Sequence, residues 1–118
     1  MSIVNKAIID LGGGNFSHEL LAVPNGVRYA VTTVLVCNTY NPNGTSPENE
    51  TSTFDMHLVP NGEAVSNVKT TIVRQLSLPA GETFTFDSEK IVLDPGDKII
   101  LVGDSPANLA ATVSYLEV

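Results

Sequence analysis

Cysteine and tryptophan are the scarcest residues in this chain, which has one cysteine, Cys37, and no tryptophan. A single cysteine excludes an internal disulfide. Cys37 ends the apolar run Val34–Cys37, and no histidine or basic residue stands beside it to favour the reactive thiolate. The sequence therefore predicts a buried, unreactive cysteine and not a nucleophile.

Basic residues are also few, with six lysines and arginines against 13 acidic residues, for a net charge of −7. Binding to a nucleic-acid backbone needs a clustered basic face. No two of the six are adjacent in the sequence, where they stand as Lys6, Arg28, Lys69, Arg74, Lys90 and Lys98. We therefore expect no nucleic-acid partner, and an acidic surface that favours solubility and contact with basic patches on other proteins.

Long apolar runs are absent as well. No stretch approaches the roughly 20 apolar residues of a membrane span. Residues 1–14 lack the basic start and continuous apolar core of a secretory signal. We therefore expect no membrane partner and synthesis in a cytoplasm. The length of 118 residues suits one domain.

Helical periodicity is missing, apart from one helical turn that could form over residues 64–68. Instead, short apolar or alternating segments are separated by turn residues, as in Pro79–Gly81 and Asp94–Asp97. This pattern predicts an all-β fold, an antiparallel β-sandwich of jelly-roll-like or Ig-like type with eight or nine strands and little or no helix. The nine strand candidates are residues 7–9, 18–23, 27–38, 53–59, 68–76, 83–86, 91–93, 98–102 and 110–116.

The first 26 residues differ in character from the rest. The short apolar strand Ala7–Ile9 is followed by the glycines Gly12–Gly14, which have no lysine or helix after them and so do not form a phosphate loop. We predict that residues 1–26 form an N-terminal arm with a glycine-rich hinge and residues 27–118 the sandwich. The alternative is that Ala7–Ile9 is the first strand of its own sheet. Asn25–Gly26 predicts a hairpin.

The candidate core follows from alternation along the strands. Residues 27–38 are apolar or threonine-rich on both faces, which predicts a central strand covered on both sides. In residues 53–59, alternation places Asp55 and His57 outward, on one solvated face. The side chains predicted to be buried are Val31, Leu35, Phe54, Met56, Leu58, Phe84, Ile99, Leu101 and Val113.

Catalytic and metal-binding patterns are lacking. His18 and His57 are the only histidines, which offers no serine triad and too few ligands for a transition metal. Carboxylates gather at turns, where aspartate bonds its own backbone and faces water, and they lack the spacing of a calcium loop. We therefore predict no enzyme activity, no catalytic or metal site and no cofactor. These carboxylates are Asp87, Glu89, Asp94, Asp97 and Asp104.

The longest polar segment, residues 39–52, predicts an exposed loop that could make contacts. Its matches to the glycosylation pattern, Asn43–Thr45 and Asn49–Thr51, are attributed to chance.

A family resemblance lies in the strand-and-turn segments. In order these are YAVTTVLVCN (29–38), FDMHLVPNG (54–62), LSLPAGETF (76–84), KIVLDPGD (90–97) and ATVSYL (111–116). This order resembles small virion structural proteins of tailed bacteriophages, particularly those of cyanobacteria, over residues 27–118. The resemblance implies a β-sandwich used on capsids, necks, tails or fibres, with no catalytic residues.

From this resemblance we expect a capsid decoration or cement protein that binds the outer shell and stabilises it. A tail, neck, baseplate or fibre component is the alternative. The expected partners are other virion proteins, such as the major capsid protein, and further copies of the chain in a homo-oligomer such as a trimer. The expected location is the virion, after synthesis in the host cytoplasm. A carbohydrate-binding module is the alternative from another class, although the chain has only seven aromatic residues to stack on sugars.

Overall fold

The computed structural model describes residues 2–10, 16–41, 43, 51–87, 91–103 and 107–118, with the side chains of all these except 2–10, 16, 107 and 108. The described residues form nine strands and no helix. The strands are β1 (Ser2–Asp10), β2 (Phe16–Ala22), β3 (Tyr29–Asn38), β4 (Thr51–Val59), β5 (Thr71–Pro79), β6 (Thr83–Phe86), β7 (Ile91–Leu93), β8 (Lys98–Gly103) and β9 (Ala107–Glu117).

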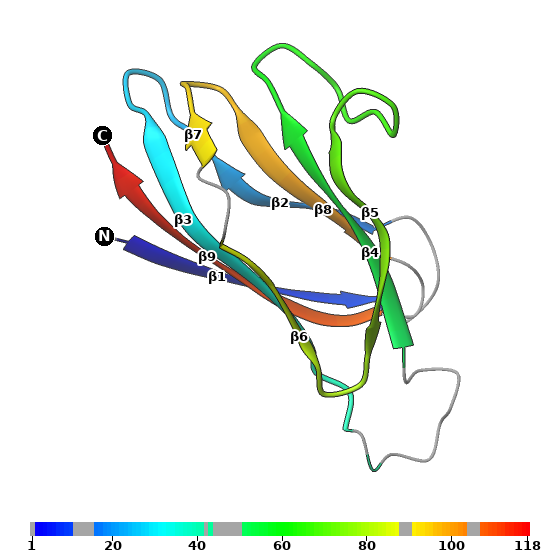
Figure 1. The fold of residues 1–118 in the computed structure, drawn as a ribbon. Coiled ribbons are helices and arrows are strands. Elements are labelled where there is room, and N and C mark those ends of the chain that lie inside the picture. Colours follow the sequence, from blue (N-terminus) through cyan, green and yellow to red (C-terminus); the bar gives the residue numbers. More distant parts are fainter. Residues whose placement is uncertain (1, 11–15, 42, 44–50, 88–90, 104–106) are drawn as a thin grey trace.

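The strands make two antiparallel sheets that pack face to face (Figure 1). The first sheet has the order β1-β9-β3-β6, with β7 also paired to β3. The second sheet has the order β2-β8-β4-β5. The predicted all-β sandwich is therefore confirmed, and the molecule is an elongated slab of 48 × 27 × 21 Å.

Consecutive strands alternate between the two sheets, with two exceptions. β4 and β5 form a hairpin in the second sheet, and β6 and β7 both pair with β3 in the first. In an Ig fold the first two strands share a sheet. Here β1 belongs to the first sheet and β2 to the second. β6 and β7 together occupy one strand position at the edge of the first sheet. The resulting order is that of a jelly roll, the first of the two predicted types.

The first 26 residues contribute a strand to each sheet and do not form a separate arm. β1 pairs with β9 along its whole length, from Ser2 opposite Tyr115 to Asp10 opposite Ala107. β2 pairs with β8. The alternative prediction, that the first apolar segment belongs to its own sheet, is therefore the one that the pairing supports. The proposed glycine hinge lies outside the described residues.

The hairpin predicted at Asn25–Gly26 was wrong in its pairing. Gly26 does adopt the left-handed conformation of a tight turn, with φ of +83°. The turn, however, joins β2 in the second sheet to β3 in the first, so the two strands do not pair. The chain reverses direction between sheets, which the local sequence does not distinguish from reversal within a sheet.

The turn Asp94–Asp97 also crosses between the sheets, from β7 to β8. Asp97 accepts hydrogen bonds from the backbone N–H of Asp94 at 2.9 Å and of Asn61, in the turn after β4, at 3.0 Å. Gly96 has φ of +87°, and a Cβ there would overlap the Asn61 side chain. One aspartate thus fastens two turns at the same end of the sandwich, and the space beside them requires glycine.

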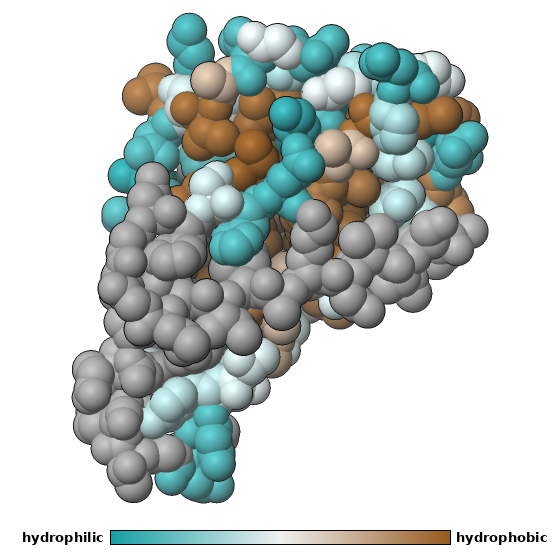
Figure 2. Space-filling model, turned by 180° about the vertical axis from the view of Figure 1, so that it is seen from behind, coloured by the Kyte–Doolittle hydropathy of each residue, from teal (hydrophilic) through white to brown (hydrophobic). Residues whose placement is uncertain are grey.

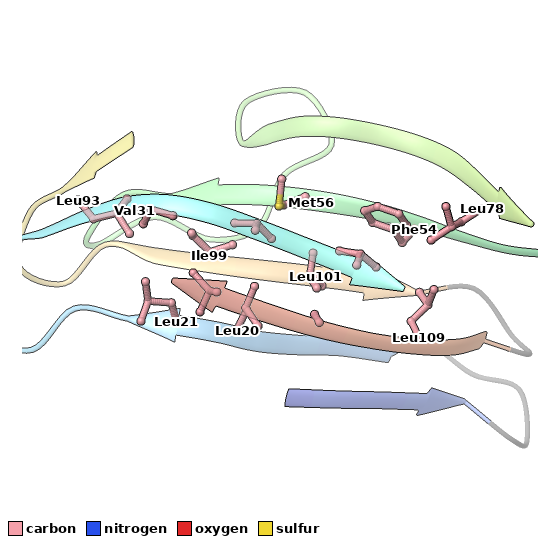
Figure 3. Close-up of a cluster of buried hydrophobic side chains, with 14 of the residues drawn as sticks. Leu20, Leu21, Val31, Phe54, Met56, Leu78, Leu93, Ile99, Leu101 and Leu109 are labelled. Carbon is pink, nitrogen blue, oxygen red and sulfur yellow. The ribbon is translucent and has the colours of Figure 1, made fainter. Parts of the chain in front are cut away.

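The core lies between the inner faces of the sheets (Figure 3). The predictions of burial are confirmed for Val31, Phe54, Met56, Ile99, Leu101 and Val113. Leu58 and Phe84 are half-buried and pack against this core. Leu35 was wrongly predicted, because 37% of its surface is exposed. β3 is central in its sheet, as expected, but the described residues cover only its inner face.

Candidate functional site

The outer face of the second sheet carries a polar hollow of about 510 Å³. Four strands and one turn contribute to it, because the chain between β4 and β5 lies beside this face. The lining residues are Ser17, Asp55, His57, Val65, Asn67, Arg74, Gln75 and Val102. Register explains why they meet, since Val102 on β8 lies opposite both Ser17 on β2 and Asp55 on β4.

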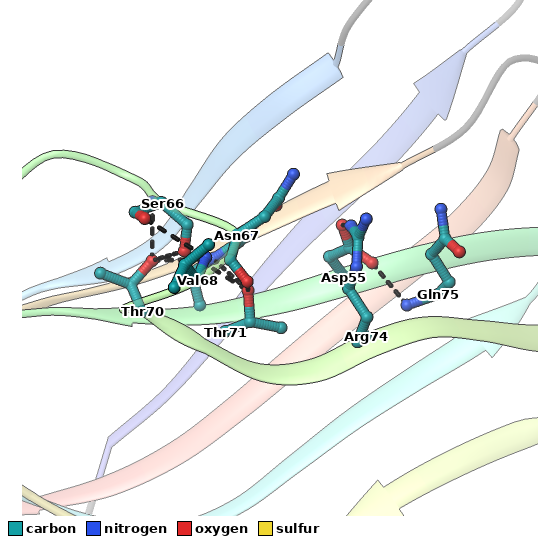
Figure 4. A network of polar contacts seen from close by, with 9 residues as sticks. Asp55, Ser66, Asn67, Val68, Thr70, Thr71, Arg74 and Gln75 are labelled. Atoms are coloured by element: carbon teal, nitrogen blue, oxygen red, sulfur yellow. Dashed lines mark hydrogen bonds and ion pairs between the residues drawn. The ribbon is translucent and has the colours of Figure 1, made fainter.

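A β-bulge shapes one side of the hollow (Figure 4). Phe54 pairs with Leu76 and Met56 with Val73, so Asp55 faces two residues of β5, Arg74 and Gln75. The register shift here is a bulge, a device that re-aims side chains.

Asp55 holds the bulge in place. Its carboxylate accepts a hydrogen bond from the backbone N–H of Gln75 and forms a 2.9 Å ion pair with Nη1 of Arg74. Gln75 has φ of +48°, the one positive value outside glycine among the described residues. The aspartate thus stabilises a backbone conformation that a residue with a side chain rarely adopts.

His57 is fully buried on the same side of β4. Its Nδ1 lies 2.9 Å from the hydroxyl oxygen of Thr70. That hydroxyl donates its single proton to the carbonyl of Ser66 at 2.8 Å and accepts from the N–H of Ser66 at 2.9 Å. Nδ1 must therefore carry the ring proton and donate to Thr70, which leaves Nε2 as an acceptor when the ring is neutral.

Nε2 of His57 is buried without a hydrogen-bond partner. Burial lowers the pKa of the imidazole, Asp55 partly opposes this effect and Arg74 reinforces it. The ring is thus held neutral. It supports the turn of residues 66–70, in which Ser66 also accepts a backbone hydrogen bond from Thr70. This turn lies slightly beyond the helical turn predicted over residues 64–68.

Alternation along residues 53–59 predicted the correct direction for the side chains of Asp55 and His57 but the wrong surroundings. Both point away from the core, as alternation predicted. They are buried and not solvated, because the chain after β4 and the bulge of β5 cover them. Arg74 and Gln75 were missed. Their signal was an irregular spacing, since Val73 and Leu76 both pack on the core although three positions, and not two, separate them.

Acidification should reveal the buried imidazole through stability. In the unfolded chain His57 gains a proton below about pH 6.5, whereas in the folded chain its lowered pKa keeps it neutral to a lower pH. The free energy of unfolding should therefore fall as the pH drops from about 6.5 to the folded-state value. Denaturant titrations at several pH values, of wild type and His57→Asn, measure this effect. Asparagine keeps a donor for Thr70, and the other histidine is common to both chains.

The variant should be less stable near neutral pH, because asparagine fills less of the buried site. Its stability should then depend less on pH between about 7 and 5 than that of the wild type. Parallel pH profiles for the two proteins would show that His57 is not the group responsible.

The outer face of the first sheet is chemically different, because none of the described side chains on it is charged. Eleven described side chains lie on it in register, and serine, threonine, alanine and larger apolar residues dominate. β1 continues the rows, since Ala7 pairs with Ala110 and Asn5 with Thr112. The eleven are Ala30, Thr33, Leu35, Cys37, Thr83, Thr85, Val92, Ala110, Thr112, Ser114 and Leu116, and we call them the uncharged face.

Cys37 belongs to this uncharged face and not to the core, where it was predicted. It is half-buried, and its Sγ lies 3.6 Å from the carbonyl oxygen of Asn38. Three exposed apolar residues, Leu35, Val92 and Leu116, lie on the same face. Ala30 pairs with both Val92 and Leu116, so the last two are joined in one row across three strands.

Other exposed apolar side chains lie elsewhere. Figure 2 shows apolar residues gathered in the upper half of the molecule seen from behind, with a hydrophilic band between them. The remaining large ones are Val65, Val68, Ile72 and Val118. Exposed apolar residues alone therefore do not define one site. The absence of charged side chains distinguishes the uncharged face of the first sheet from the other surfaces that carry such residues.

The remaining candidates from the sequence do not come together. His18 is the register partner of the core residue Leu101, so the two histidines lie on opposite faces of the second sheet. Asp94 and Asp97 are used within a turn, and Asp94 also pairs with Arg28 at 2.8 Å. Within the described ranges, no three histidine, cysteine or acidic side chains are grouped to hold a metal. Glu89, Asp104 and most of the loop 39–52, including Asn49, lie outside those ranges.

Comparison with known proteins adds no relative. The chain matches no protein-family model, no curated protein and no solved structure. No helix suited to crossing a membrane occurs in the part of the chain that the structure describes. What the fold and the two outer faces define is thus a jelly-roll β-sandwich with one uncharged face and one face that bears a polar hollow.

Proposed function

We propose that the protein is a virion structural protein of a tailed bacteriophage, a capsid decoration or cement protein that binds the outer shell. A tail, neck, baseplate or fibre position is the alternative place in the particle. The sequence resemblance supports this proposal, and so does the strand order, because jelly rolls recur in viral capsid and lectin domains. The observation that carries it is the uncharged face of the first sheet.

An uncharged face suits assembly of an acidic protein. With a net charge of −7, two copies of the chain repel one another wherever carboxylates meet. The cores of protein interfaces are likewise depleted of charge. The outer face of the first sheet lets another copy, or a capsid subunit, approach without opposing carboxylates. By contrast, the outer face of the second sheet carries the ion pairs Asp55–Arg74 and Glu19–Lys98.

The size of the first sheet supports the same use. β1, β9 and β3 have 9, 11 and 10 residues, and the fourth position in the sheet is filled by β6 with four residues and β7 with three. With strands spaced by about 4.8 Å and about 3.4 Å per residue, the face measures about 20 by 30 Å. Two such faces would bury about 1,200 Å² in total, which is the lower end of stable interfaces. A homo-oligomer, such as a trimer, or a complex with a shell protein is thus within reach of this surface.

A charge placed on the uncharged face should prevent assembly. Leu35→Glu puts a carboxylate at its centre, and we expect self-association or particle binding to weaken at least about tenfold, since burying an unpaired charge is costly. Ile72→Glu, on the second sheet, is a matched control because the two side chains are 37% and 39% exposed. Sedimentation velocity measures the first effect, and cosedimentation with particles measures the second. Equal behaviour of the two variants would remove the face from the proposal.

The role itself is tested on particles. Virions purified by density gradient from the organism that carries the gene should contain this chain in many copies, detected by mass spectrometry beside the major capsid protein. Detection of the chain only in cells without particles would overturn the virion role. In that case the uncharged face would serve an assembly other than a virion.

A further inference from the structure

The polar hollow of the second sheet is not used by an assembly role for the first sheet. Its volume of about 510 Å³ lies within the range of small-molecule sites. Asp55 and Arg74 neutralise one another across 2.9 Å, and His57 is held uncharged by burial. The charged groups in the hollow therefore sum to zero, which favours a neutral ligand over an anion or a metal cation.

The lining groups offer hydrogen-bond acceptors beside donors. The Asp55 carboxylate accepts two hydrogen bonds within the chain, and a carboxylate has about four acceptor positions. Arg74 uses one donor in the ion pair, and its side chain is half exposed. Ser17, Asn67 and Gln75 add exposed hydroxyl and amide groups, each of which can donate and accept.

His57 contributes a buried, uncharged side chain to the lining of the hollow. A fully buried side chain that lines the hollow keeps one ring nitrogen without a hydrogen-bond partner. Because Nδ1 carries the proton, this nitrogen can only accept. A buried acceptor left unmatched is costly and is uncommon in proteins. Nε2 has almost no exposed surface, so a ligand would meet His57 as an uncharged part of the lining and not as a hydrogen-bond acceptor.

Backbone geometry points to the same place. Gln75 is the residue with positive φ, at a bulge that Asp55 holds in place. Strained backbone and bulges concentrate at binding sites, where they direct side chains toward a ligand. The bulge lets Arg74 and Gln75, which are consecutive in sequence, both line the hollow. The unfavourable backbone conformation of Gln75 therefore places two polar side chains at one site.

We propose that the hollow binds a small, neutral, polyhydroxylated ligand, namely a saccharide unit. Its hydroxyls would donate to Asp55 and accept from Arg74, and Val65 and Val102 would contact its C–H surface. No phenylalanine or tyrosine of the described residues lines the hollow, so stacking on such a ring does not contribute and a single sugar should bind weakly, with a Kd near the millimolar range. The proposal does not depend on a virion role.

Titration followed by amide NMR tests the proposal on the full chain. Glucose, galactose, mannose and N-acetylglucosamine are each added to the ¹⁵N-labelled protein, with glycerol as a nonspecific control. At least one sugar should produce saturable shifts of the backbone amides of Ser17, Asn67 and Gln75, which glycerol does not reproduce. If all four sugars leave these amides unchanged, or act only as glycerol does, the proposal is wrong.

Variants then assign the binding to the hollow. Arg74→Met should raise the Kd at least about tenfold by removing a charged donor. Lys98→Met is the matched control, because Lys98 pairs with Glu19 on the same sheet but does not line the hollow. Asn67→Ala, an exposed change, gives a second test if loss of Arg74 unfolds the bulge. Equal affinity of wild type, Arg74→Met and Asn67→Ala would overturn the assignment.

Sodium sulfate separates a sugar site from an anion site. If Arg74 acts mainly as a cation, sulfate should shift the same amides more strongly than any sugar, and the proposal of a neutral ligand fails. If Asp55 balances the charge of Arg74, sulfate should leave these amides unchanged at concentrations where the sugar saturates them.

Discussion

Phe54→Ala should destabilise the protein by about 3–5 kcal/mol, because it removes a fully packed ring from the core. Phe54 is 1% exposed and lies edge-on to Phe84, with ring centroids 5.7 Å apart. Little room exists for neighbours to collapse into the space, since the ring lies between the two sheets near Leu78 (Figure 3). In a domain of this size the melting temperature should fall by roughly 10–25 °C, which calorimetry or thermal circular dichroism measures.

Phe86→Ala is the control for this change. Phe86 continues the aromatic row, with its ring centroid 6.5 Å from that of Phe84, but it is half-buried at the rim. It loses the same atoms from a site that water already reaches, so its cost should be clearly smaller. Similar losses of stability in the two variants would show that Phe54 is packed no more tightly than Phe86.

Deleting residues 1–11 should abolish the folded monomer. β1 pairs with β9 over nine residues, and about nine backbone hydrogen bonds at about 0.5–1.5 kcal/mol each approach the whole stability of a domain. Removal also exposes an edge of β9 to pairing with other chains. We expect the truncated chain to aggregate or to lose its cooperative denaturation.

Addition of the missing strand in trans provides the control. A peptide of residues 2–10 should restore cooperative unfolding to the truncated chain, and a scrambled peptide of the same composition should not. If the truncated chain instead unfolds at the wild-type midpoint, β1 contributes nothing to its own sheet. The hypothesis of an arm that binds a neighbouring subunit would then return.

Strand identity could be predicted from the sequence because it is encoded locally. Alternation placed Phe54 and Met56 inward, and the structure buries both. Turn residues located Gly81 and Gly96, which have the positive φ that such turns require. A period of two and the chemistry of turns are properties of a few neighbouring residues, so eight or nine strands were expected, and the described residues form nine.

Surroundings could not be predicted because they depend on residues distant in sequence. Nothing near Leu35 indicates that the outer face of its sheet is left uncovered by the chain. Nothing near His57 indicates that Thr70 and the chain after β4 would bury it. Asn25–Gly26 specifies a tight turn but not which sheet receives the next strand. The hollow could not be predicted for the same reason. Besides β4, its lining residues come from β2, β5, β8 and the chain between β4 and β5.

The position of β9 between β1 and β3 has a consequence for biosynthesis. The first sheet cannot be completed until the last strand, of 11 residues, has left the ribosome. Until then β1 lacks the partner with which it pairs in the described sheet, and β3 has only β6 and β7 beside it. Completion of the first sheet should therefore be slow, as expected when most pairings are distant in sequence. The net charge of −7 then has a second use, because it keeps nascent chains with open strand edges apart.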